Sequence, residues 1–172
     1  KLPNGFKPKP VTYMKGLVYD AKTNAPLSAH FELIELEKGY GQINIAGYLQ
    51  AYAEDLARLV QELRPSILHA ASNHINGLVV NAVAKHFNIP SIYEVRGLWE
   101  ITRISRQPEF EGSEYFQMMS SLEARSASDA NYVFAITHAL ADEMKKRSDN
   151  ITEVGFLPNG VHSERFIPVE AN

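Results

Sequence analysis

The 172-residue sequence contains no cysteine, so it has neither a disulfide framework nor a cysteine-based zinc site. No apolar run approaches the roughly 20 residues that a membrane-spanning helix needs, and no signal peptide is recognisable. Neither sign of charge dominates. The 17 Lys and Arg residues are interspersed with 20 Asp and Glu residues, which leaves no basic stripe for a nucleic-acid backbone. We therefore expect a soluble, cytoplasmic protein that does not bind nucleic acid.

Common signatures of metal and nucleotide sites are also missing. Six histidines are present, but His69 and His74 are five residues apart, which does not fit the i,i+4 spacing of a helical zinc pair. The sequence has no Walker A loop and no Gly-x-Ser-x-Gly elbow. A Gly-Tyr-Gly triplet at 39–41 begins like a dinucleotide fingerprint, but Asn44 stands where the third glycine should be. We expect no metal and no nicotinamide or flavin cofactor.

The last two thirds of the chain alternate between helical and extended apolar patterns. Strand, helix, strand and helix at short spacing favour right-handed crossovers, and so predict an α/β fold with a Rossmann-like parallel sheet flanked by helices. The run at 132–136 is apolar without alternation, which is typical of a strand covered on both faces. We expect helices over 45–63, 73–87, 113–129 and 137–147, and strands over 66–70, 92–95, 132–136 and 154–157, with a long loop before residue 113.

The remaining segments are assigned more coarsely. Residues 1–44 form a loosely assigned N-terminal segment, with extended stretches at 11–19 and 30–36 that could make a hairpin or an irregular edge decoration. The helices should begin at capping residues, namely Ser72 or Asn73, then Ser113, then Thr137. We treat residues 1–172 as a single domain.

Ligands of an open parallel sheet bind beyond the carboxyl ends of its strands. That rule selects four segments here, at 69–73, 96–100, 137–138 and 158–160. Two of them are also helix starts, where free backbone N–H groups favour an anion. The architecture therefore suits a polar or anionic ligand.

The most unusual of these segments follows the expected strand at 92–95. Glu94 and Arg96 are two residues apart, so on a strand they point to the same face. Gly97 allows a sharp turn and a close approach of a ligand. Trp99 offers a flat apolar face of the sort that sugar rings pack against. Two interpretations stay open: an internal ion pair with Trp99 as loop packing, or one wall of a binding cleft.

A second polar patch comprises His69, Ser72, Asn73 and His74, directly after the strand at 66–70. Helix capping explains Ser72 and Asn73 as well as ligand binding does. Both readings are kept.

Four stretches of the chain resemble the N-terminal domain of GT4-type glycosyltransferases of the GT-B fold. Residues 64–72 read RPSILHAAS, 88–100 read NIPSIYEVRGLWE, 128–137 read SDANYVFAIT, and 156–168 read FLPNGVHSERFIP. The second stretch is similar to a YEVRGLWE subgroup. Many family members carry histidine where this chain has Arg96, and aspartate where it has His162. The resemblance covers about residues 64–168.

The resemblance implies a retaining enzyme that moves a sugar from a nucleotide diphosphate donor to a glycan or lipid-linked acceptor. It implies no metal or other cofactor. It also implies a C-terminal GT-B domain that binds the donor, with residues 158–172 as the start of the linker, and an isolated N-terminal part that is inactive. The expected catalytic residues are Glu94 and Arg96. The expected substrate-binding residues are His69, Ser72, Asn73, Gly97, Trp99, Glu100, Thr137, Asn159 and Gly160.

The resemblance further suggests a role in cell-envelope or exopolysaccharide biosynthesis, in the cytoplasm or at the inner face of the membrane. Peripheral membrane contact and a homodimer of the chain stay open as partners. Two other functions also stay open. One is a sugar-nucleotide epimerase of the same fold, and the other is a non-catalytic α/β ligand-binding module.

Overall fold

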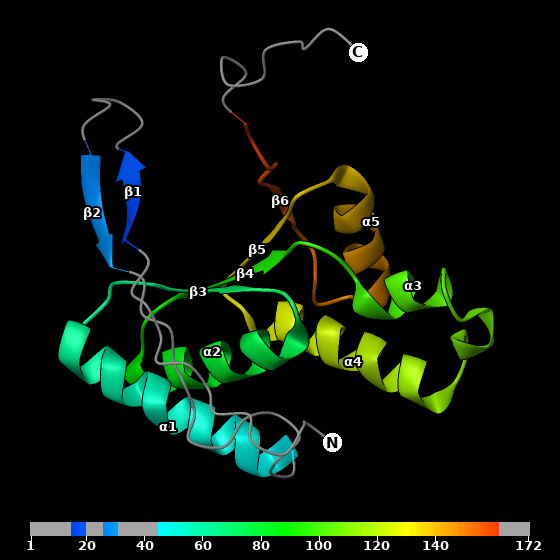
Figure 1. Cartoon of the computed structure of the whole chain (residues 1–172), viewed down its shortest axis with the longest axis horizontal. Coiled ribbons are helices and arrows are strands. Elements are labelled where there is room, and N and C mark those ends of the chain that lie inside the picture. The colour runs from blue at the N-terminus through cyan, green and yellow to red at the C-terminus, as the bar shows by residue number, and fades with distance from the viewer. Residues whose placement is uncertain (1–14, 20–25, 31–44, 162–172) are drawn as a thin grey trace, which may run out of the picture. The chain divides into compact units, whose positions relative to one another are not determined.

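The computed structural model describes residues 15–19, 26–30 and 45–161. The chain forms two compact units, residues 1–64 and residues 65–172. The described part of the first unit contains a β-hairpin and one long helix. The second unit contains a four-stranded sheet with its helices (Figure 1).

The hairpin pairs β1 (Lys15–Tyr19) with β2 (Pro26–His30) in antiparallel register, with Lys15 opposite His30 and Tyr19 opposite Pro26. A hairpin was one of the two forms expected here. The second strand nevertheless begins four residues earlier than predicted, because proline is tolerated as the first residue of a strand. The prediction followed the apolar run at 30–36, of which residues 31–36 lie outside the described residues.

Helix α1 (Ile45–Leu63) has the predicted bounds. It ends because Arg64 adopts a positive φ of 48° and Pro65 follows, which disfavours helical backbone at Arg64. The Arg64 N–H donates to the Val60 carbonyl at 2.9 Å and closes the last turn.

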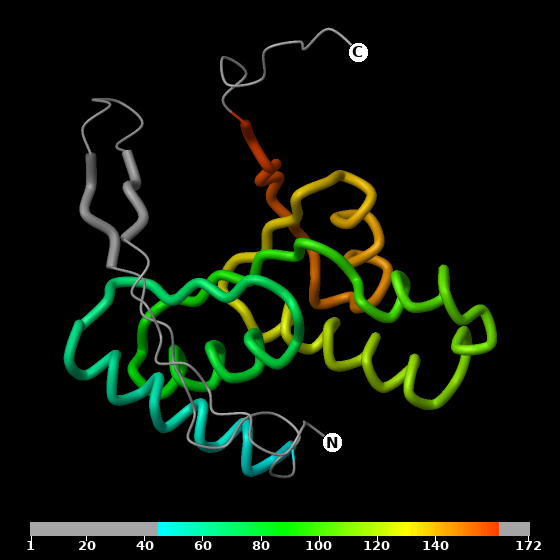
Figure 2. Tube along the Cα trace, viewed as in Figure 1, coloured from blue at the N-terminus to red at the C-terminus, as the bar shows by residue number. Residues whose placement is uncertain are grey.

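The second unit is built on a parallel sheet in the order β3-β4-β5-β6, which confirms the predicted fold class. The strands are β3 (Leu68–Ala71), β4 (Ser91–Val95), β5 (Tyr132–Ala135) and β6 (Gly155–Phe156). Neighbouring strands are joined by helical crossovers, which can be followed along the trace in Figure 2. The carboxyl ends of the strands therefore meet along one edge of the sheet.

Helices α2 (His74–Phe87) and α4 (Glu114–Asp129) pack against each other on one side of this sheet (Figure 1). Gly77 makes the close packing feasible. A β-carbon added there would lie 2.6 Å from Ser126 Cβ and 2.7 Å from Tyr93 Cε2. Tyr93 and Val95 of β4 are fully buried on this side and form the centre of the core.

The helix ends follow the capping rules. Asn73 accepts from the backbone N–H of Ile75 at the start of α2, and Ser113 caps α4 in the same way. Thr137 caps α5 (His138–Arg147). Helix α2 ends at Asn88, whose left-handed backbone (φ 54°, ψ 43°) is a common helix terminator.

The segment before residue 113 was predicted to be a long loop, and this is wrong. It contains α3 (Trp99–Ile104) and the short 3₁₀ helix η1 (Pro108–Phe110). The six residues of α3 have too little apolar periodicity to be recognised. Buried contacts of Leu98 and Glu100 define this helix instead.

Strand β5 also departs from its prediction. It was expected to be covered on both faces, but Tyr132 at its start is 58% exposed. The helix-covered face of β5 carries Ala135, which is fully buried, while Tyr132 lies on the other face. An apolar run without alternation is therefore not enough to prove that both faces are covered.

Candidate functional site

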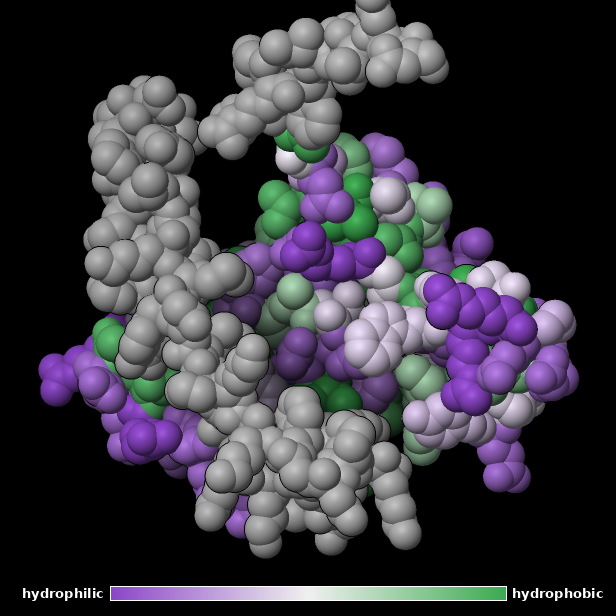
Figure 3. All heavy atoms as spheres, viewed as in Figure 1, coloured by the Kyte–Doolittle hydropathy of each residue, from purple (hydrophilic) through white to green (hydrophobic). Residues whose placement is uncertain are grey.

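A charged cluster forms where β3 and β4 end. The Glu94 carboxylate lies between two basic side chains, with Oε2 3.0 Å from His69 Nε2 and Oε1 3.6 Å from Arg96 Nε. The Glu94 side chain is 13% exposed, whereas those of His69 and Arg96 are about half exposed. Figure 3 shows hydrophilic residues gathered over this edge of the sheet. One mostly buried carboxylate thus orients two solvent-facing groups.

Ser72 joins the ends of the two strands. Its backbone N–H donates to the Glu94 carbonyl at 2.8 Å, which extends the ladder by one residue. Its hydroxyl accepts from the Arg96 backbone N–H at 3.0 Å. The same hydroxyl lies 3.5 Å from the Gly97 carbonyl. Ser72 therefore fixes the direction in which the chain leaves β4, and with it the position of Arg96.

The cluster extends to the residues that follow β6. Arg96 Nη2 lies 3.5 Å from Asn159 Oδ1. The Arg96 side chain is 54% exposed, so N–H groups of its guanidinium that Glu94 and Asn159 do not engage remain accessible to an anion. We call His69, Ser72, Glu94, Arg96 and Asn159 the strand-end cluster; all five were candidates from the sequence.

Glu100 does not join this cluster. Its side chain is 2% exposed, and its Oε1 accepts from Arg147 Nη1 at 2.6 Å, which links α3 to α5. Arg147 is itself 6% exposed and also contacts Glu143 at 3.1 Å through Nε. Sequence reasoning missed this pair, because nothing in local spacing indicates that residues 47 positions apart will meet.

Other sequence candidates have varied surroundings. The side chains of Asn73 and Thr137 cap helices, so their oxygens are already engaged. Trp99 is 60% exposed at the start of α3. A β-carbon on Gly97 or Gly160 would meet nothing within 4 Å, so no neighbour requires glycine at either position.

A buried polar network behind the cluster was also missed. The Glu123 carboxylate of α4 is 3% exposed, and it accepts from the Tyr93 hydroxyl and, at 2.8 Å, from the His74 backbone N–H. Burial raises the pKa of Tyr93 well above its ordinary value, and the Glu123 carboxylate raises it further. The network ties the start of α2 to β4. No sequence signal distinguishes Glu123 from the solvent-facing carboxylates of its helix.

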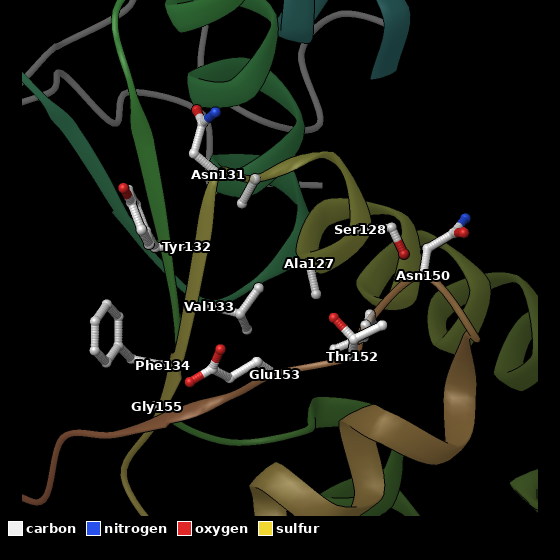
Figure 4. Close-up of a pocket in the computed structure, with 12 residues that line it drawn as sticks. Ala127, Ser128, Asn131, Tyr132, Val133, Phe134, Asn150, Thr152, Glu153 and Gly155 are labelled. Carbon is white, nitrogen blue, oxygen red and sulfur yellow. The ribbon is translucent and has the colours of Figure 1, made fainter.

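A separate pocket of about 390 Å³ lies beside the start of β5 and the segment that leads into β6 (Figure 4). Val133 projects into it toward Ala127 and Thr152, whereas Tyr132 and Phe134 project from the other side of the strand. The lining combines apolar and aromatic groups with uncharged polar ones and a single carboxylate, Glu153. It has no cluster of charged groups comparable to the strand-end cluster.

Within the described ranges, no group of three or more His, Cys, Asp or Glu side chains is arranged to hold a metal ion. No helix among these residues has the length and apolarity required to cross a membrane.

Comparison with known proteins identifies the family of the chain. The sequence profile of Glycosyltransferase Family 4 matches residues 36–165, which is more than half of the chain. The matched region includes α1 and every residue of the strand-end cluster. It begins earlier than the resemblance at 64–168 had indicated. A search of curated proteins finds no match.

Proposed function

The chain belongs to Glycosyltransferase Family 4, and from this we propose that it is the acceptor-side domain of a retaining glycosyltransferase. The donor in this proposal is a nucleotide diphosphate sugar, and the acceptor is a glycan or a lipid-linked sugar. The supporting observation is the strand-end cluster, in which Glu94 contacts both His69 and Arg96. It lies where ligands bind in open parallel sheets.

The reaction makes two demands on such a cluster. The bond between the anomeric carbon and the diphosphate oxygen breaks while a bond to the acceptor oxygen forms, and the acceptor proton passes to the departing phosphate. Negative charge on the leaving group must be stabilised, and the acceptor hydroxyl must be held against the anomeric carbon. A guanidinium serves the first demand through paired hydrogen bonds with anionic oxygens.

We assign that role to Arg96, with Glu94 as the residue that orients it. Glu94 near Nε and Asn159 near Nη2 restrict the guanidinium, which stays about half exposed. His69 and Ser72 then form the side of the cleft that meets the acceptor. Asn159 and Gly160 begin the link, residues 158–172, to a second domain that binds the donor. Glu100 has no part in this proposal, because its carboxylate is committed to Arg147.

The proposal needs no metal, and it places the enzyme in the cytoplasm or at the inner membrane face, in cell-envelope or exopolysaccharide synthesis. Metal independence can be tested directly, because the transfer rate should not change when a chelator is added. Retention can be tested by determining the anomeric configuration of the product by NMR.

The decisive experiment is Arg96→Ala in the full-length protein, assayed for transfer from a panel of nucleotide sugars. Removing an electrostatic contact to developing charge typically costs about 10²–10³ in rate, and we expect a loss of that order. Arg125→Ala is the matched control, since Arg125 is an exposed arginine paired with Asp129 on α4. Unchanged transfer by Arg96→Ala would contradict the proposal.

A further inference from the structure

The pocket beside Trp99 contains two arginines that have no role in the reaction described so far. It is an open pocket of about 670 Å³, lined by exposed residues of α3 and the turn after it. The lining residues are Trp99, Thr102, Arg103, Arg106 and Gln107. Their spacing of i, i+3, i+4, i+7 and i+8 places them along one face of a helical segment.

The pocket lies close to the strand-end cluster along the chain. Trp99 follows Arg96 by three residues, so their Cα atoms cannot be more than about 11 Å apart. Figure 3 shows strongly hydrophilic residues gathered over α3 and the turn that follows it. A ligand held at the cluster could therefore reach this pocket with its next chemical group.

The charge of the pocket is not neutralised by the protein. Arg103 Nε donates to the neutral Gln107 amide oxygen at 2.8 Å, and its guanidinium lies 4.2 Å from the centre of the Phe110 ring. The Arg106 side chain has no partner among the described residues. No carboxylate lines the pocket. By contrast, Arg96 and Arg147 each contact a carboxylate.

Buried contacts hold α3, the helix that carries these groups, in place. Next to the pocket face of α3, Glu100 is buried against Arg147, and Leu98, just before the helix, is 5% exposed. The stacking of Arg103 on Phe110 further restricts that guanidinium. The cost of ordering the Arg103 side chain on binding is therefore reduced, which favours affinity.

We propose that this pocket binds a phosphate or diphosphate group of the acceptor, with Trp99 packed against the sugar to which that group is attached. The proposal rests on the function proposed above and adds the chemical class of the acceptor. Arg103 and Arg106 are one helical turn apart, with β-carbons about 5–6 Å from each other, so they can contact different oxygens of one phosphate or diphosphate group. A carboxylate has only two oxygens, so it would form fewer hydrogen bonds with the two guanidinium groups.

Trp99 is the only tryptophan in the sequence, so the tryptophan fluorescence of the chain reports on this pocket alone. The chain is titrated separately with glucose 1-phosphate, inorganic pyrophosphate and glucose. We expect a saturable change in emission with the two phosphates, weaker binding at high salt, and no change with glucose at the same concentrations. Equal responses to glucose and glucose 1-phosphate, or no response to either phosphate, would overturn the proposal.

Arg106→Gln is the clean variant, because no described side chain depends on Arg106. We expect it to bind glucose 1-phosphate about tenfold more weakly, which corresponds to about 1.4 kcal/mol. Arg125→Gln, on α4 and outside the pocket lining, should bind like the unaltered chain. Equal affinity in Arg106→Gln and the unaltered chain would also refute the proposal.

Two sources of the phosphate are distinguished by a further titration with a sugar diphosphate that carries a short prenyl chain. Tighter binding than that of glucose 1-phosphate supports a lipid-linked acceptor, and equal binding supports a soluble sugar phosphate. A change in emission with phosphatidylglycerol vesicles but not with either sugar phosphate would instead identify a membrane contact and overturn the proposal.

Transfer assays on the full-length protein separate this proposal from the preceding one. Phosphate binding at Trp99 without any glycosyl transfer would refute the proposed function and leave the anion site standing. Equal transfer to neutral and phosphorylated acceptors, with a normal rate in Arg106→Gln, would refute the acceptor assignment and leave the proposed function standing.

Discussion

Replacing Glu100 by glutamine tests whether this side chain holds α3 in place or contacts a substrate. The Glu100 carboxylate is 2% exposed and lies 2.6 Å from Arg147 Nη1, so the substitution removes a charge from a buried pair without changing the shape of the side chain. Arg147 then remains buried beside Glu143, its half-exposed second partner. We expect a folded but less stable protein.

The expected change in the free energy of unfolding follows from the ionic contact that Arg147 loses. Removing one partner of a buried ion pair costs about 3–5 kcal/mol, and a hydrogen bond to a charged group contributes about 1.5–3 kcal/mol. The lower range applies, because glutamine keeps an oxygen that accepts from Arg147 and Glu143 Oε1 stays 3.1 Å from Arg147 Nε. We therefore expect the free energy of unfolding to fall by about 2 kcal/mol.

Urea denaturation followed by circular dichroism measures this change. With a denaturant slope of about 1–3 kcal/mol/M, the midpoint should fall by about 1 M. Asp129→Asn is the control, because it breaks the exposed pair with Arg125, and we expect less than about 0.5 kcal/mol there. An unshifted midpoint for Glu100→Gln would refute the reasoning. So would a double-mutant cycle with Arg147→Gln that shows no coupling.

Three further predictions concern the core and the helix caps. Gly77→Ala should destabilise the chain by about 1–3 kcal/mol in chemical denaturation, because the new β-carbon would lie 2.6 Å from Ser126 Cβ; a neutral effect would mean that α2 and α4 can separate freely. Tyr93→Phe should cost about 1.5–3 kcal/mol, since buried Glu123 loses a hydrogen-bond donor, and a thermal melt would detect it. Thr137→Ala should cost about 1 kcal/mol through the lost α5 cap and be rescued by Thr137→Ser; no rescue would point to a role beyond capping.

Much of the fold could be predicted because its signals are local. The bounds of α1 follow from an apolar stripe that stops at Arg64 and Pro65. Asn73, Ser113 and Thr137 cap the helices that they were expected to cap, since each side chain needs only backbone groups two or three residues away. Helix α3 was missed because it depends on the distant Arg147, not on its own sequence.

The same distinction applies to the site. A general rule for parallel sheets selected the segments after β3 and β4, which contain His69, Ser72 and Arg96. Glu94 was found separately, from its spacing of two residues to Arg96. The role of Glu100 could not be deduced in this way. It shares a segment with Arg96, yet its carboxylate is buried against Arg147 and does not line the pocket. Proximity in sequence locates a site, but only packing decides which side chains face it.

The register of the sheet explains how β4, a central strand, can carry the charged residues of the strand-end cluster. In the parallel pairing of β3 with β4, His69 lies opposite Ile92 and Ala71 lies opposite Glu94, so His69 and Glu94 are diagonal neighbours on one face. Arg96, two residues beyond Glu94, continues the same face past the end of the strand. The alternate residue Tyr93 is buried on the face that α2 and α4 cover. A shift of one residue would turn Glu94 toward those helices and expose Tyr93, so the packing that buries Tyr93 also holds the charges at the surface.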